Sequence, residues 1–239
     1  QKVLCKIYLP IYFQHFYIWV EFFFVISGFF LAMHASREGT CGSIEYVSGQ
    51  VKKLYPLYVI GFIFSFAVVN CTSGVLLKQW IDGLWRAKWE ILLCAMWGFD
   101  NSSVVYNGGG APTYISTLLI CSFVLYYLIS KHKEFFVCVL CPIVVIGGLG
   151  RIINNYGNLS QWMAWDGLFN SGNIRGMVDM SVGAIFALVV LPRLKQTKNI
   201  WMLRVCGIFL PIVCIVGLVV ARNQITYNDL IIYIFVFAL

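Results

Sequence analysis

The sequence predicts an all-α fold, a polytopic bundle of transmembrane helices. Of the 239 residues, 60% are hydrophobic and only 11% are charged, which is too little charge for the surface of a soluble domain. Apolar runs long enough to cross about 30 Å of hydrocarbon recur along the whole chain, and short polar stretches separate them. Because a helix satisfies its own backbone hydrogen bonds within lipid, a helical bundle follows.

The first half of the chain is expected to hold three spans. Residues 3–18 form an apolar run that Pro10 interrupts, and residues 19–34 form a second run. A third span is expected at residues 54–70, directly after two lysines. Between residues 71 and 112, charges are mixed into apolar sequence at near-helical spacing, so we expect either no crossing or two there, with three tryptophans at headgroup depth.

The second half is expected to hold five spans. The turn-rich sequence "NSSVVYNGGGAPT" precedes the first of them, and basic or polar stretches separate the others. The expected ranges are 114–130, 134–150, 177–194, 202–221 and from residue 227 onward. In total we expect about eight spans in a single membrane domain, residues 1–239, which we interpret as truncated at both ends from a ten-span protein.

Basic residues predict the orientation. The net charge of +7 comes from Lys and Arg that gather between apolar runs, which indicates topology and no nucleic-acid partner. The three clusters are expected on the cytoplasmic side of a cell membrane, either a plasma membrane or a bacterial inner membrane. They comprise Arg37, Lys52 and Lys53; Lys131, His132 and Lys133; and Arg193, Lys195, Lys198 and Arg204. The polar segment 151–175 would then face outward.

His15 and Glu21 are the candidate catalytic residues. An ionisable group within a span costs about 2.5–3.5 kcal/mol at the bilayer centre, so it needs an interior partner or a wet cavity. A histidine in an apolar setting can take a proton from an alcohol, and a carboxylate nearby can fix its tautomer. The two residues meet only if the chain turns between them. The alternative is an interfacial histidine and a solvated glutamate.

The candidate binding residues are polar groups beside the expected spans. Lys52 and Lys53 stand where a cytosolic loop meets the membrane, a suitable place for cofactor phosphates, although topology alone also explains them. Arg175 and Asp179 are four residues apart and can pair on one helix face. The candidate substrate-binding residues are Asn107, Tyr114, Ser116, Arg151 and Arg175.

No resident metal or cofactor is expected. Cys138 and Cys141 have the spacing of a metal or thiol site, but no second Cys or His pair lies near them. The chain has no Gly–Lys phosphate loop, dinucleotide fingerprint or serine nucleophile elbow. Most of the nine cysteines lie in apolar runs, and we interpret them as small buried hydrophobes.

Four stretches in this order resemble the integral-membrane acyltransferase family 3. They are "WVEFFFVISGFFLA" at 19–32, "VKKLYPLYVIGF" at 51–62, "GAPTYISTLLI" at 110–120 and "RGMVDMSVGAIFA" at 175–187. The resemblance implies a membrane enzyme that transfers an acyl group, usually acetyl, from cytosolic acetyl-CoA or another acyl-CoA to a hydroxyl of a cell-envelope sugar or polysaccharide. It also implies that His15 matches the essential histidine of the family and that Lys53 stands where the family usually has arginine.

Two other functions remain open at this stage. A transporter or flippase of lipid-linked sugars would also carry polar residues inside its bundle. A non-catalytic membrane scaffold or sensor of the same fold is the third possibility.

Overall fold

The computed structural model describes residues 17–37, 41–72, 77–94, 111–156, 165–166 and 169–196. Nearly all of this part of the chain is helical. The helices are α1 (Tyr17–Ala35), α2 (Ser43–Thr72), α3 (Leu77–Arg86), α4 (Lys88–Ile91), α5 (Ala111–Phe135), α6 (Cys141–Tyr156), α7 (Ser171–Ile185) and α8 (Leu191–Gln196). Two π-helical segments, η3 (Phe136–Leu140) and η4 (Phe186–Val190), join α5 to α6 and α7 to α8, and a small antiparallel pair, β1 (Trp165–Asp166) and β2 (Phe169–Asn170), precedes α7.

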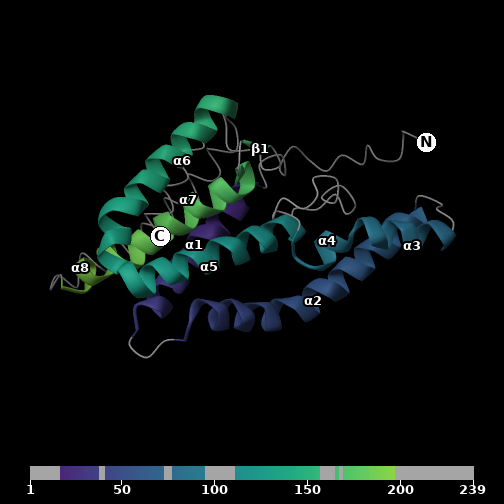
Figure 1. Cartoon of the computed structure of the whole chain (residues 1–239), viewed down its shortest axis with the longest axis horizontal. Coiled ribbons are helices and arrows are strands. Elements are labelled where there is room, and N and C mark those ends of the chain that lie inside the picture. The colour runs from purple at the N-terminus through teal and green to yellow at the C-terminus, as the bar shows by residue number, and fades with distance from the viewer. Residues whose placement is uncertain are drawn as a thin grey trace, which may run out of the picture.

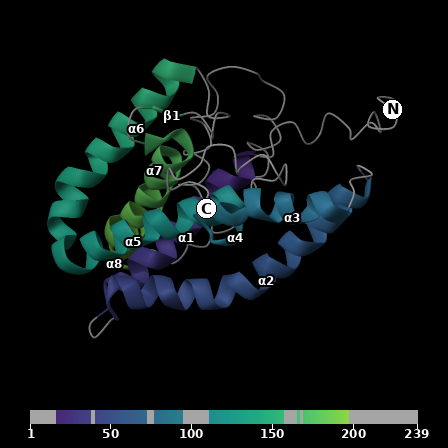
Figure 2. The same cartoon turned by 45° about the vertical axis from the view of Figure 1, so that its right-hand side comes forward.

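Helices α1, α5 and α7 run in the same direction, and α2 and α6 run the opposite way (Figures 1 and 2). On α1 and α5, Phe24 packs on Tyr114 and, further along both helices, His34 packs on Tyr126. Tyr126 also stacks on Tyr46, near the start of α2, which places α2 antiparallel to α5. These five helices therefore alternate in direction along the chain, as helices that cross a membrane in turn would.

Three continuous helical stretches are long and apolar enough to cross a membrane: Ser43–Thr72, Thr113–Asn155 and Ser171–Arg193. A shorter apolar helix spans Val20–Ala35. Large side chains point out of the bundle along these stretches, such as Leu57 (75% exposed), Phe64 (72%) and Ile146 (73%). So much exposed apolar surface suits lipid as the solvent. An eight-span count is not confirmed, because the expected spans at 202–221 and beyond 227, and residues 3–16 of the first expected span, lie outside the described residues. Residues 17 and 18 of that first span belong to α1.

The stretch Thr113–Asn155 bends at His132, whose backbone angles (φ −136°, ψ 49°) are not helical. After this bend α6 returns along α7, where Gly148 of α6 lies against Val178 and Cys141 donates to the carbonyl of Ser181. The bend therefore separates the two spans that the sequence predicts at 114–130 and 134–150.

Two helices begin earlier than the sequence predicts. Helix α2 begins at Ser43, eleven residues before the expected 54, so Lys52 and Lys53 lie within a helix and not in a loop. Helix α7 begins at Ser171, because the Asn170 side chain accepts a hydrogen bond from the Gly172 backbone N–H and caps the helix. At the start of both helices, polar residues that are typical of a loop form the first helical turn.

Helices α3 and α4 fold back against α2, and neither is long enough to cross a membrane. Trp80 of α3 packs edge-on against Phe66, and the Tyr58 hydroxyl donates to the Glu90 carbonyl of α4 at 2.7 Å. The ten residues of α3 span only about 15 Å. Within residues 77–94 there is thus no transmembrane helix, and the apolar side chains of Ile81 and Trp85 stay exposed, as expected for a segment in the membrane interface.

The described basic residues of the three predicted clusters share one end of the bundle, apart from Lys52 and Lys53. This end, the basic end, is formed by the end of α1, the start of α2, the bend near the end of α5 and helix α8 (Figure 1). It carries Arg37, Lys131, His132, Lys133 and Arg193. A common side for the clusters is the arrangement that the positive-inside rule requires, and its assignment to the cytoplasm stays a prediction.

Candidate functional site

The site forms where α1 and α7 lie closest together. Gly28 of α1 lies against the backbone of Met180, and Gly183 of α7 lies against the backbone of Val25 and Phe29. A Cβ atom at either glycine would overlap that backbone. Small residues at these two positions let the helices approach to backbone contact, as in other membrane bundles.

One ion pair crosses this interface. A guanidinium nitrogen of Arg175, Nη2, donates to Oε1 of Glu21, and the two residues are separated by 154 positions in the sequence. Glu21 is fully buried and Arg175 is 5% exposed. A buried charge needs a partner of opposite sign, because removing it from water costs several kcal/mol. The pair therefore explains how a carboxylate is tolerated within the apolar helix α1.

A second carboxylate lies one helical turn further along α7. Asp179 is fully buried and four residues after Arg175, so both occupy the same face of the helix. With both acids ionised, Glu21, Arg175 and Asp179 carry a formal charge of −1. Oε2 of Glu21 has no hydrogen-bond partner among the described residues. The site can thus accept a proton or a donor group from a ligand.

Helix α5 adds neutral polar groups beside the pair. Thr117 donates to the Asn173 side-chain oxygen at 3.0 Å, and its methyl group packs against Gly176. Tyr114 packs on Phe24 with ring centroids 4.6 Å apart. These contacts place Tyr114 and Thr117 in the neighbourhood of Glu21 and Arg175, and together they form the α1–α5–α7 cluster.

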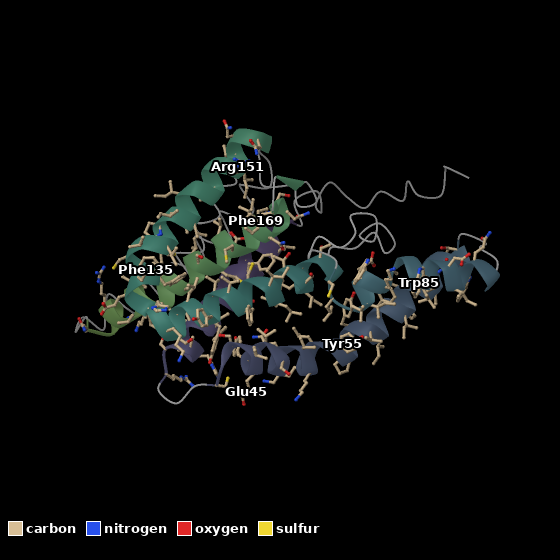
Figure 3. All side chains as sticks on the ribbon, viewed as in Figure 1. Glu45, Tyr55, Trp85, Phe135, Arg151 and Phe169 are labelled. Atoms are coloured by element: carbon tan, nitrogen blue, oxygen red, sulfur yellow. The ribbon has the colours of Figure 1, made fainter. Side chains whose placement is uncertain are left out.

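The structure brings only some of the predicted site residues together. Glu21, Arg175 and Tyr114 belong to the α1–α5–α7 cluster. Ser116 is buried on α5, but it is two positions from Tyr114 and faces another side of the helix. Lys52 and Lys53 are exposed on α2, and Arg151 is exposed near the outer end of α6 (Figure 3). His15 and Asn107 lie outside the described residues.

Two earlier interpretations need correction. Glu21 is not a solvated helix flank, because none of its surface is exposed. Arg175 does not end an outward-facing polar loop, because it lies inside α7 and contacts α1. The sequence interpretation did not assign a site role to Thr117 or Asn173. The available signal was the small polar series Thr113, Thr117 and Cys121, which repeats every four residues along one face of α5.

Comparison of the chain with protein-family models, with curated proteins and with solved structures finds no match.

Proposed function

We propose that this protein is a membrane O-acyltransferase, an enzyme that moves an acyl group, acetyl in the simplest case, from acyl-CoA to a hydroxyl of a cell-envelope sugar or polysaccharide. The observation that carries the proposal is that three of the four stretches that resemble the integral-membrane acyltransferase family 3 pack around one buried ion pair. Glu21 comes from 19–32, Arg175 from 175–187, and Tyr114 and Thr117 from 110–120. Residues so far apart in sequence have converged on one charged site inside an apolar bundle.

In the proposed reaction, His15 removes the proton from the acceptor hydroxyl, whose oxygen then attacks the thioester carbonyl of acyl-CoA. The C–S bond breaks, and the CoA thiolate leaves and takes up the proton. Glu21 orients the imidazole of His15, and Arg175 fixes the carboxylate of Glu21 in place. Arg175 and Tyr114 are the proposed acceptor contacts, with Asn107 as a further one.

Lys52 and Lys53 are proposed to hold the phosphates of CoA. Both ammonium groups are exposed on α2 and are therefore open to an anionic ligand. A lysine attracts phosphate as a point charge, without the two-pronged geometry of arginine. Ser116 and Arg151 are given no role in this proposal.

The test uses the full chain in lipid nanodiscs with isotopically labelled acetyl-CoA and an envelope glycan. We expect label in an ester on the glycan, and we expect its rate to fall about 100-fold or more in His15→Ala. His132→Ala is the matched control, because His132 lies at the exposed bend near the end of α5. Unchanged acetylation by His15→Ala would refute the assignment of His15.

A transporter is the second candidate, and one observation favours it. Two buried carboxylates, Glu21 and Asp179, lie on the two helices that meet at the buried Arg175, a pattern also suited to ion or proton coupling. Vesicles that contain the protein separate the two functions. Net movement of a lipid-linked sugar across the bilayer without consumption of acetyl-CoA would support transport and exclude the acyltransferase.

A further inference from the structure

A second group of reactive side chains lies at the basic end. Tyr46 of α2 stacks on Tyr126 of α5 with ring centroids 4.3 Å apart, and Gln50 donates to the Tyr46 hydroxyl at 2.7 Å. His34 of α1 packs on both rings, with centroids 5.2 Å and 5.8 Å away. Three helices thus fix the orientation of these rings, and we call the group, with Cys41, the tyrosine cluster.

The Tyr126 hydroxyl connects an imidazole to a thiol. It lies 3.1 Å from Nδ1 of His34 and 3.7 Å from Sγ of Cys41. In one hydrogen-bond direction, the thiol donates to the hydroxyl and the hydroxyl donates to Nδ1. In the reverse direction, Nδ1–H donates to the hydroxyl, which donates to sulfur. These two arrangements are the states before and after a proton moves from Cys41 to His34.

The contact with the Tyr126 hydroxyl distinguishes Cys41 from the other described cysteines. Cys121 and Cys141 are buried in the core, and Cys71 and Cys138 are exposed. Cys94 is half-buried like Cys41, but its thiol donates to the backbone carbonyl of Leu92. Cys41 is half-buried, and its sulfur lies against the hydroxyl of Tyr126, which is fully buried. It also lies two residues before α2, whose N-terminal dipole attracts the negative charge that develops on an attacking sulfur.

We propose that Cys41 is a nucleophile that accepts an acyl group from a thioester donor. The class of donor rests on the acyltransferase function proposed above, and this covalent step at the basic end is separate from the direct attack of the acceptor hydroxyl proposed at the α1–α5–α7 cluster. Sγ attacks the thioester carbonyl, the new C–Sγ bond forms, and the bond between the acyl carbon and the donor sulfur breaks. The proton of Cys41 passes through the Tyr126 hydroxyl to His34 and then to the departing thiolate. One thioester is consumed and one is formed, so no oxidant or reductant is needed.

The proton relay is tested first, with no acyl donor present. The full chain in nanodiscs is treated with iodoacetamide, and alkylation of each cysteine is followed by peptide mass spectrometry. We expect the alkylation rate of Cys41 to fall about tenfold in Tyr126→Phe and in His34→Gln, because each variant breaks the path by which the thiol proton leaves. Tyr127→Phe is the matched control, because Tyr127 is 51% exposed on the same helix.

The buried Cys121 and Cys141 of the same molecule serve as internal standards, because a general loss of structure would expose both thiols to the reagent. A Cys41 rate that is unchanged in Tyr126→Phe or in His34→Gln would overturn the relay.

The acyl group is tested next with isotopically labelled acetyl-CoA and no acceptor. We expect a hydroxylamine-sensitive label on the peptide that contains Cys41, absent in Cys41→Ser and at least tenfold slower in Tyr126→Phe. If Cys41 carries no label while the wild-type protein still acetylates glycans, the covalent step is wrong and the acyltransferase stands. If Cys41 is labelled but no glycan accepts the group, the covalent step stands and the proposed acceptor function fails.

Discussion

The two ends of the bundle accommodate charge in opposite ways. At the α1–α5–α7 cluster, the charged residues Glu21, Arg175 and Asp179 are buried. The apolar interior can hold the charge of Glu21 because Arg175 contacts it from a neighbouring helix. At the basic end, residues such as Lys131 and Lys133 are exposed and need no protein partner to be stable. The comparison indicates that the buried charges of the α1–α5–α7 cluster stabilise helix packing in addition to contacting any ligand. The exposed charges of the basic end are available mainly to ligands and lipid headgroups.

The largest expected effect comes from removing one member of the buried pair. Arg175→Met leaves Glu21 buried without its ionic partner and should destabilise the protein by about 3–5 kcal/mol. The double variant Glu21→Gln with Arg175→Met should recover much of that loss, because no lone charge remains. Unfolding in detergent titrations measures both. Arg151→Met, an exposed arginine on α6, is the control and should change stability by less than about 0.5 kcal/mol.

If Arg175→Met is as stable as the wild-type protein, Glu21 does not need Arg175 as an ionic partner. The contrast between buried, paired charge at the α1–α5–α7 cluster and exposed charge at the basic end would then be wrong.

A smaller effect is expected from the helix contact that brings the pair together. Gly183→Ala places a methyl group against the Val25 backbone and should cost about 1–3 kcal/mol because the helices must separate. Gly147→Ala is the matched control, since a Cβ there meets nothing within 4 Å. Alanine is the better helix former, so this control should be neutral or stabilising by up to about 1 kcal/mol. Equal stability of the two variants would contradict the close α1–α7 approach.

The smallest effect on stability is expected for the two lysines of α2. Replacing both Lys52 and Lys53 by Gln should change the free energy of unfolding by less than about 0.5 kcal/mol, because both side chains are exposed. If they hold CoA phosphates, KM for acetyl-CoA should rise about tenfold and kcat should change little. Steady-state kinetics at two salt concentrations measure this. The same substitution at Lys131 and Lys133 is the control, and an equal rise in KM there would point to general attraction by the basic end.

Among the described residues, the sequence was sufficient to predict which apolar runs are helical, but it did not predict how charged residues pair between the helices. The expected span 19–34 differs by only two residues from the start of α1 and one from its end, because its apolar run is unbroken. The starts of α2 and α7 could not be predicted as well, since the polar residues in their first turns fit a loop equally well. The Glu21–Arg175 contact depends on α1 and α7 being neighbours, and no local pattern encodes a contact between residues 154 positions apart.

The distance along the chain between Glu21 and Arg175 also has a consequence for biosynthesis. At about 5–20 residues per second, a ribosome needs roughly 8–30 s to add the 154 residues that separate the two. During this interval α1 has been made and its ionic partner has not. The carboxylate must therefore stay protonated, hydrated or near lipid headgroups until α7 is inserted. The order of translation thus makes the docking of α7 against α1 a late step in the assembly of the bundle.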